Sequence, residues 1–324
     1  MLQQSHRPTP PAAEPAAVRP SVETGPVALL LGATAPHHHP GEAAVTAALL
    51  ETWSSGVTTW VVDRPELLAA RGPEARVLAD MATGLDSLDA AACAAWARDS
   101  AARGHRFDLV LGLSEDVQTA AAEVAAALHL PGNHPEAVRT VQDADARRAA
   151  LVAGGFLVDE DPDRAPEGIA VTSVGAFVSG RPHVFLLASP AKNGWTGVGP
   201  LPRSPRQVAA ESAAAAAHLG LCFGLFRVDL RVTDRGIAVT DVRLSLEAPG
   251  LRAHVDATLP GVEFLSLVYD DALGRTAPLP ATPLAPAPEP RPPAPAAPGV
   301  APFALLAGEP AGAAAEPHIC RGID

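Results

Sequence analysis

Short apolar runs alternate with alanine-rich stretches through the first half of the chain. The runs at 27–32, 58–63 and 107–112 are rich in branched apolar residues, which predicts buried strands. Helices are predicted between and after these strands, at 41–53, 85–102, 115–128 and 144–152. Strands that alternate with helices form parallel sheets covered on both faces, so this half predicts an α/β fold with a doubly wound parallel sheet.

Polar residues mark the starts of two of these helices. Ser114 precedes Glu115 and Asp116, and carboxylates in a first turn favour the positive end of the helix dipole. Asp143 precedes the helix at 144–152, which two glycines end. Between the two helices, the prolines of 131–135 predict a loop.

The second half changes to β-rich runs joined by turns. Runs at 168–179 and 183–187 meet at Ser179-Gly180, which predicts a hairpin, and runs at 223–232 and 237–244 predict a second antiparallel pair. Ser204-Pro205 is an N-cap followed by a first-turn proline, which predicts a helix from there to Gly220. A closing helix is predicted at 261–272. This half therefore predicts an α+β domain with antiparallel strands.

Proline and alanine dominate both ends of the chain, where apolar periodicity is lost. Such segments cannot bury enough apolar surface to offset chain entropy, so we expect them to be disordered. Four regions result: a disordered segment at 1–25, an α/β domain at 26–140, an α+β domain at 141–275, and a Pro/Ala-rich tail at 276–324. The tail ends in a short apolar stretch around Phe303, either a frayed terminus or a docking peptide.

Charge and hydropathy exclude several partners. The formal net charge is −12, and the 24 Lys and Arg residues form no cluster, which excludes a nucleic-acid partner. Apolar runs fall far short of the roughly 20 residues that span a bilayer, so no membrane partner is expected. The polar, proline-rich start carries no apolar leader and predicts a cytoplasmic protein. The three cysteines form no CxxC pair, which argues against a cysteine zinc site.

Two stretches, in the same order along the chain, carry a family resemblance. In the first, His-Leu-Pro-Gly-Asn-His-Pro-Glu-Ala-Val at 129–138 is followed by Gln142-Asp143, Arg148 and Leu-Val-Ala-Gly-Gly at 151–155. This stretch resembles the junction between the N-terminal and nucleotide-binding domains of the ATP-grasp carboxylate–amine ligases, especially the amino-acid and dipeptide ligases. The family has a lysine directly after the aspartate, where this chain has Ala144.

The second stretch, at 220–245, resembles the strands that hold catalytic magnesium in that family. Magnesium takes hard oxygen ligands, often one or two carboxylates plus substrate phosphates. The resemblance implies Asp229 as the first metal carboxylate and Asp241 in place of a bridging glutamate. The asparagine and arginine that follow in the family are replaced by Arg243 and Ser245, and a guanidinium group at 243 would compete with the cation.

The resemblance implies that the α+β domain is truncated, because a segment expected in the family is missing between the two stretches. Active members carry two nucleotide-gripping lysines, a glycine-rich flap and an acidic hinge here, whereas this chain has only the acidic residues 156–167. The one lysine of the chain, Lys192, is a candidate phosphate contact or a solvated loop residue. Lys192 and Arg243 are the predicted cofactor-binding cations.

The resemblance therefore implies a degenerate ATP-grasp ligase-like protein. It would act as a non-catalytic binding or partner protein in the synthesis of amino-acid- or peptide-derived metabolites, alongside a full-length ligase or a second copy of itself. The alternative is an active ligase that uses ATP and Mg to form an acyl-phosphate and then an amide bond. An amino acid or another small carboxylate is the expected ligand in either case.

A third possibility is a small-ligand site at the carboxyl edge of the first sheet. His37, His38 and His39 follow the first predicted strand, and Asp63 ends the second. Doubly wound sheets bind ligands at this edge, so these four residues are candidate ligand contacts. Adjacent histidines in one loop are equally typical of a solvated surface, and the first loop lacks the GxGxxG pattern of a dinucleotide site.

Overall fold

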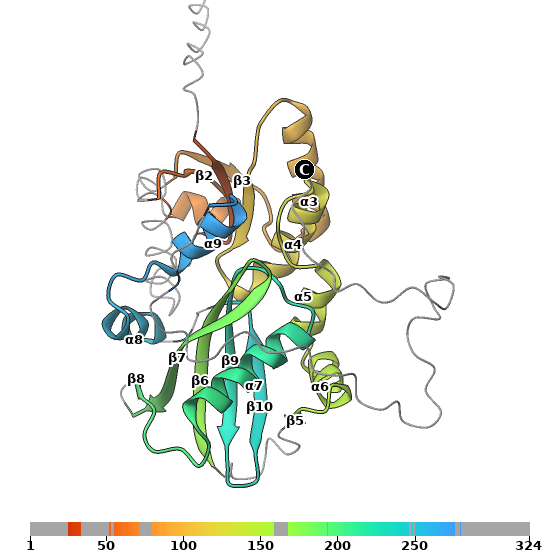
Figure 1. Ribbon diagram of the computed structural model, residues 1–324. Helices are drawn as coiled ribbons and strands as arrows, with labels where there is room; N and C mark the ends of the chain where they lie inside the picture. Colours follow the sequence, from red (N-terminus) through yellow and green to blue (C-terminus); the bar gives the residue numbers. More distant parts are fainter. Residues whose placement is uncertain are drawn as a thin grey trace, which may run out of the picture.

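The computed structural model describes residues 25–33, 52, 55–70, 79–158, 168–192, 194–245, 248, 250–275 and 279. These residues form two sheets that lie one beyond the other, with helices packed on both (Figure 1). The first sheet is fully parallel and has the order β3-β2-β1-β4. Its strands are β1 (Val27–Leu31), β2 (Thr58–Asp63), β3 (Met81–Gly84) and β4 (Leu109–Gly112).

The second sheet has six strands in the order β5-β10-β9-β6-β7-β8. All of its pairings are antiparallel except that of β5 with β10. Its strands are β5 (Leu157–Val158), β6 (Ile169–Val178), β7 (Arg181–Ala191), β8 (Gly194–Gly197), β9 (Leu225–Val232) and β10 (Ile237–Arg243). The predicted fold class, a parallel α/β sheet followed by an α+β part with antiparallel strands, is confirmed.

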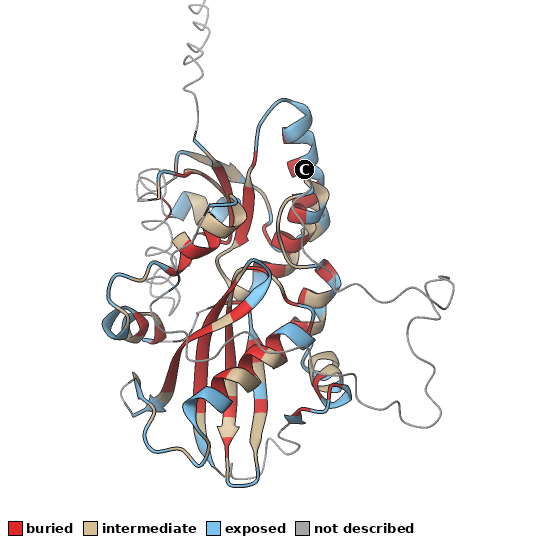
Figure 2. Ribbon diagram, in the orientation of Figure 1, coloured by how far each residue is buried: buried red, intermediate tan, exposed pale blue. Residues whose placement is uncertain are grey.

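Helices cover both sheets. They are α3 (Ala90–Ala102), α4 (Gln118–Ala127, preceded by the 3-10 turn Glu115–Val117), α5 (Pro135–Gln142), α6 (Ala144–Ala153), α7 (Pro205–His218), α8 (Leu251–Thr258) and α9 (Phe264–Ala272). The strands are mostly buried and the outward helix faces are exposed (Figure 2). No helix among the described residues is long and apolar enough to cross a membrane.

Alternating side chains divide the parallel sheet between two apolar clusters. Leu29 of β1 packs with α3 and α4 on one face. Leu30, its neighbour, packs on the other face with Leu265 and Tyr269 of α9. A different side of α9 joins α8 against the second sheet, through Phe264. The helix predicted to close the second domain therefore also covers the first sheet.

Several predicted local signals are confirmed. The β6–β7 hairpin turns through Ser179 and Gly180, both with positive φ (51° and 70°), as a type I′ hairpin requires. Asp143 caps α6 by accepting hydrogen bonds from the backbone N–H groups of residues 145 and 146. Ser204 and Gln207 form a capping box at the start of α7.

Other predictions were wrong in detail. The loop expected at 131–135 is followed directly by α5, because Pro135 is its first-turn residue and His134 caps it. Ser114 makes no capping bond, since its hydroxyl instead contacts the Asp116 carboxylate. The helix predicted from residue 85 begins at Ala90, where Asp89 accepts a hydrogen bond from Ala92 N. The short elements β3, β5, β8, α5 and α8 were not predicted from the sequence.

Candidate functional site

The two predicted metal carboxylates lie opposite one another. Asp229 of β9 pairs directly with Asp241 of β10, just beyond a register shift at Val239. Thr172 of β6 stands on the other side of Asp229, and its hydroxyl donates to Asp229 Oδ1 at 2.5 Å. The antiparallel register therefore brings the two carboxylates together, as the resemblance implied.

Arginines engage both oxygens of Asp241. Arg147 of α6 places Nη2 2.8 Å from Oδ1, and Arg243 donates from Nε to Oδ2 at 2.7 Å. The Arg147 and Asp241 side chains are only 16% and 17% exposed, so water screens this pair weakly. Burial acts to lower the pKa of Arg243, but its hydrogen bond to Asp241 and the nearby carboxylates outweigh burial and raise it.

Asp229 is engaged in the same way. Its Oδ2 lies 3.4 Å from Nη2 of Arg227, a side chain that is 7% exposed, while Thr172 holds Oδ1. A magnesium ion would have to displace guanidinium groups that already neutralise both carboxylates, so these residues do not fit the ion. In agreement, the described part of the chain contains no group of three or more His, Cys, Asp or Glu arranged to hold a metal.

Glu115, which was not among the predicted site residues, is a third acidic residue close to Asp229 and Asp241. Ser245, the residue after β10 and Leu244, donates from Oγ to Glu115 Oε2 at 2.8 Å, which links the start of α4 to the second sheet. Burial raises the pKa of Glu115, although Ser245, Arg243 and Arg227 partly offset the shift. We call Glu115, Asp229, Asp241, Arg147, Arg227 and Arg243 the ion-pair network; its three carboxylates face three guanidinium groups.

The raised pKa of Glu115 gives a testable pH dependence. A carboxyl group whose pKa is higher in the folded state favours folding while protonated, and this contribution is lost as the pH rises from the unfolded value through the folded one. Glu115→Gln should therefore gain stability relative to the parent protein as the pH rises from about 4.5 to 7. Urea unfolding at several pH values measures this. A stability difference independent of pH would contradict it, and exposed Glu136→Gln is the control.

The predicted phosphate contact Lys192 lies apart from the network. It is exposed at the turn between β7 and β8, just after Ala191. Ala188 of β7 pairs with Thr172 of β6, which pairs with Asp229 of β9, so β7 lies two strands from Asp229. Lys192 follows Ala188 by four residues along the chain. Strand spacing and rise per residue therefore place Lys192 roughly 15 Å from Asp229. Of the two predicted cofactor-binding cations, only Arg243 belongs to the network.

Of the candidate ligand residues of the first sheet, the described residues include Asp63 alone. Asp63 is 1% exposed, and its Oδ1 accepts hydrogen bonds from Arg64 N and Ser87 Oγ at 2.8 and 3.0 Å. That carboxylate therefore ties β2 to the loop before α3. His37, His38 and His39 lie outside the described residues.

Asn133 is a second residue that sequence reasoning did not select. Its Oδ1 accepts from the backbone N–H groups of Cys222 and Phe223, and its Nδ2 donates to Phe223 O, at 2.8, 2.9 and 2.9 Å. One side chain thus holds the loop before β9 against the loop before α5. Asn133 stands within the 129–138 motif that carried the resemblance, which was the available signal.

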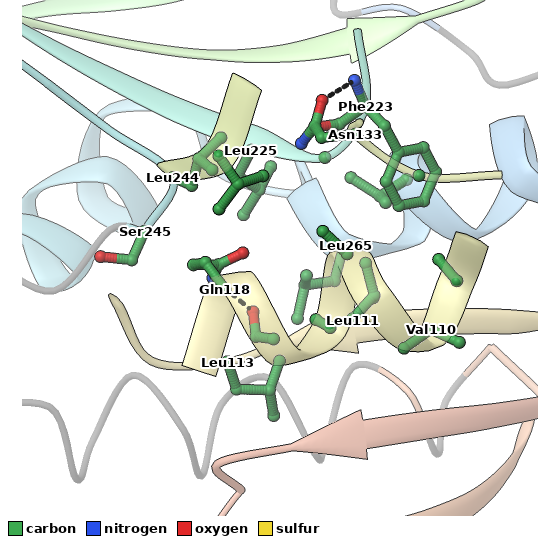
Figure 3. A pocket seen from close by; sticks show the side chains of 18 of the residues that line it. Val110, Leu111, Leu113, Gln118, Asn133, Phe223, Leu225, Leu244, Ser245 and Leu265 are labelled. Atoms are coloured by element: carbon green, nitrogen blue, oxygen red, sulfur yellow. Dashed lines mark hydrogen bonds between the residues drawn. The ribbon is translucent and has the colours of Figure 1, made fainter. Parts of the chain in front are cut away.

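A cavity of about 80 Å³ lies beside Asn133, where the two sheets meet. Figure 3 shows Leu111, Leu225, Leu244 and Leu265 around a central space, with Gln118 reaching toward it from α4. Gln118 donates both amide hydrogens, to Gly112 O at 2.9 Å and Ser114 O at 3.1 Å. The cavity is therefore mainly apolar and lies at the carboxyl end of β4.

A parallel sheet followed by this antiparallel sheet, with two carboxylates in register on its strands, defines an ATP-grasp-like fold, as the resemblance predicted. Among solved structures, L-amino acid ligase from Bacillus licheniformis aligns with a TM-score of 0.62 and 17% identity, over 78% of this chain and 75% of that one. No protein-family profile and no curated protein matches the sequence.

Two further structures show the same fold. Phosphoribosylglycinamide synthetase from Anaerococcus prevotii aligns with a TM-score of 0.59 and 13% identity, covering 78% of this chain and 76% of that one. N5-carboxyaminoimidazole synthase from Aspergillus clavatus, in complex with ADP and an aminoimidazole ribonucleotide, aligns with a TM-score of 0.58 and 13% identity. The alignment covers 81% of this chain and 80% of that one. At these identities the likeness concerns the fold.

Proposed function

We propose that this protein is a degenerate ATP-grasp ligase-like protein, a non-catalytic binding or partner protein in the synthesis of amino-acid- or peptide-derived metabolites. One observation carries the proposal: arginines already occupy the carboxylates that would hold magnesium, with Asp241 clamped between Arg147 and Arg243. Fixed guanidinium groups satisfy these carboxylates without a metal ion.

The nucleotide side of the site supports the same conclusion. Phosphates in nucleotide sites are neutralised by backbone N–H cradles, lysines and metal ions. Only ten residues, 159–168, connect β5 to β6, and they contain no lysine. Lys192 is two strands away from Asp229. These features argue against a grip on triphosphate in this chain.

The likeness of the fold to an amino-acid ligase supports the proposed partner and setting. L-amino acid ligase is among the similar structures, so a full-length ligase, or a second copy of this chain, is the proposed partner, and an amino acid or small carboxylate is the proposed ligand. We place the protein in the cytoplasm. The alternative, an active ligase that uses ATP and Mg, is favoured by the direct pairing of Asp229 with Asp241.

Calorimetric titration with ATP and Mg²⁺ tests the proposal. We expect no binding at micromolar ATP and no ADP release in the presence of an amino-acid mixture. Micromolar affinity together with turnover would establish the ligase instead. If the arginines prevent metal binding, replacing them should allow Mg²⁺ to stabilise the protein. Mg²⁺ at ten times its dissociation constant stabilises a protein that binds it by about 1.4 kcal/mol.

We therefore expect 10 mM Mg²⁺ to leave the melting temperature of the parent protein unchanged. The Arg147→Met, Arg243→Met variant should melt lower, and Mg²⁺ should raise its melting temperature by about 2 to 4 °C per kcal/mol of binding energy gained. Adding Asp229→Asn and Asp241→Asn to that variant is the control and should abolish the response. A metal response in the parent protein would contradict the proposed role of the arginines.

A further inference from the structure

We propose that the cavity between the two sheets is a binding site for a small branched aliphatic molecule that carries one hydrogen-bond donor. Its aliphatic part would lie against leucines of both sheets and of α9, and its O–H or N–H group would donate to Oε1 of Gln118. This site does not depend on the ion-pair network or on the proposed function. It would hold even if the protein were an active ligase.

The apolar walls and the volume set the size of the ligand. The cavity draws its lining from β4, α4, the start of β9, the residues after β10, and α9, and leucines such as Leu111, Leu244 and Leu265 are among the lining side chains. Leu111 and Leu265 are 7% and 5% exposed, so the walls are largely shielded from water. An apolar cavity of about 150 Å³ binds benzene, which has six heavy atoms, so about 80 Å³ suits roughly three to four heavy atoms.

Gln118 sets the polarity of the ligand. Both of its amide hydrogens are donated to backbone carbonyls, which fixes the carboxamide, and among the described residues no donor contacts Oε1. Gly112 makes room for it: a Cβ at this position would lie 3.1 to 3.2 Å from the amide atoms. Gln118, which is 9% exposed, therefore presents an oriented acceptor that remains accessible to a ligand, and a donor from the ligand would satisfy it.

The remaining polar groups disfavour an anion. Asn133 already uses its oxygen and its nitrogen to hold the loop before β9. Ser245 donates its hydroxyl to Glu115, and Arg252 directs Nε to Asp256 at 2.8 Å. Asp256, on the same helix, thus neutralises Arg252, the cation that lines the cavity. A neutral alcohol or amide fits this wall better than a carboxylate, which would be buried beside Oε1 of Gln118.

Titration of methyl-labelled protein with isopropanol tests the site by NMR. We expect saturable shifts of the methyl signals of Leu111, Leu244 and Leu265, while those of Val208 and Val255, outside the cavity, stay unchanged. Acetone has the same heavy atoms but no donor, and it should bind at least fivefold more weakly. Acetate should also bind more weakly. Equal affinity for acetone, or shifts that never saturate, would overturn the proposal.

Two alanine positions of equal exposure provide the matched variants. Ala122 of α4 lines the cavity, whereas Ala94 of α3 is buried away from it, and each is 5% exposed. Ala122→Val should fill the space and reduce isopropanol affinity more than tenfold, whereas Ala94→Val should leave it within twofold. Gln118→Met should remove the preference for isopropanol over acetone. Unchanged binding in folded Ala122→Val protein would refute the site.

Discussion

Tyr269→Ala is expected to lower the free energy of unfolding by about 4 kcal/mol, the usual loss for deleting a fully buried aromatic side chain. Tyr269 of α9 is 0% exposed and packs with Leu30 and Leu109 of the parallel sheet. Its hydroxyl is also hydrogen-bonded to Thr52. The substitution would leave a void between a helix near the end of the described chain and the first strand.

Urea unfolding, followed by circular dichroism, measures this loss. Tyr269→Phe is the control: it keeps the ring and loses only the contact with Thr52, so about 1 kcal/mol is expected. If both variants lost the same amount, the hydroxyl rather than ring packing would hold α9 to the sheet. If Tyr269→Ala lost under 1 kcal/mol, α9 would not be part of the first core.

Asn133→Ala is expected to cost about 2 to 3 kcal/mol of unfolding free energy. The substitution removes three hydrogen bonds and leaves two backbone N–H groups, those of Cys222 and Phe223, without their acceptor. Each unpaired group in a partly buried place costs about 1 to 3 kcal/mol, and partial access to water keeps the sum at the lower end.

The matched variant is Asn133→Asp, which keeps an acceptor for both N–H groups and loses the donor to Phe223 O. We expect it to cost about 1 kcal/mol, less than half of the alanine loss. Guanidinium unfolding of both variants distinguishes these values. A loss for aspartate as large as that for alanine would show that the amide donor, not the shared acceptor, holds the two loops together.

Residues with strong local preferences allowed much of the fold to be predicted. β-branched and apolar runs located β1 and β2, and the positive-φ pair Ser179-Gly180 located the hairpin. The missed strands have a common cause. Strands β3, β5 and β8 have only two to four residues, and their pairing partners rather than their own sequences make them strands.

The pairing of the two site carboxylates was predictable from the family resemblance, which put Asp229 and Asp241 on adjacent strands. Alternation alone would not have paired them, because the register that pairs Ile237 with Val232 would place residue 240 opposite Asp229, and the register shift after Val239 brings Asp241 there. The charges around them were not predictable, because Arg147 arrives from α6 and Glu115 from the turn before α4, and both contacts depend on how distant segments pack. The same holds for Asn133, whose partners lie about 90 residues further along the chain.

The place of α9 has a consequence for synthesis of the protein. Strand β1 leaves the ribosome roughly 230 residues before the helix that covers one face of its sheet. At a translation rate of about 5 to 20 residues per second, that face stays uncovered for roughly 10 to 50 s before α9 is synthesised. During that interval the nascent chain exposes the apolar side chains of Leu30, Val61 and Leu109. Chaperone binding should therefore be strongest on ribosomes stalled before residue 264.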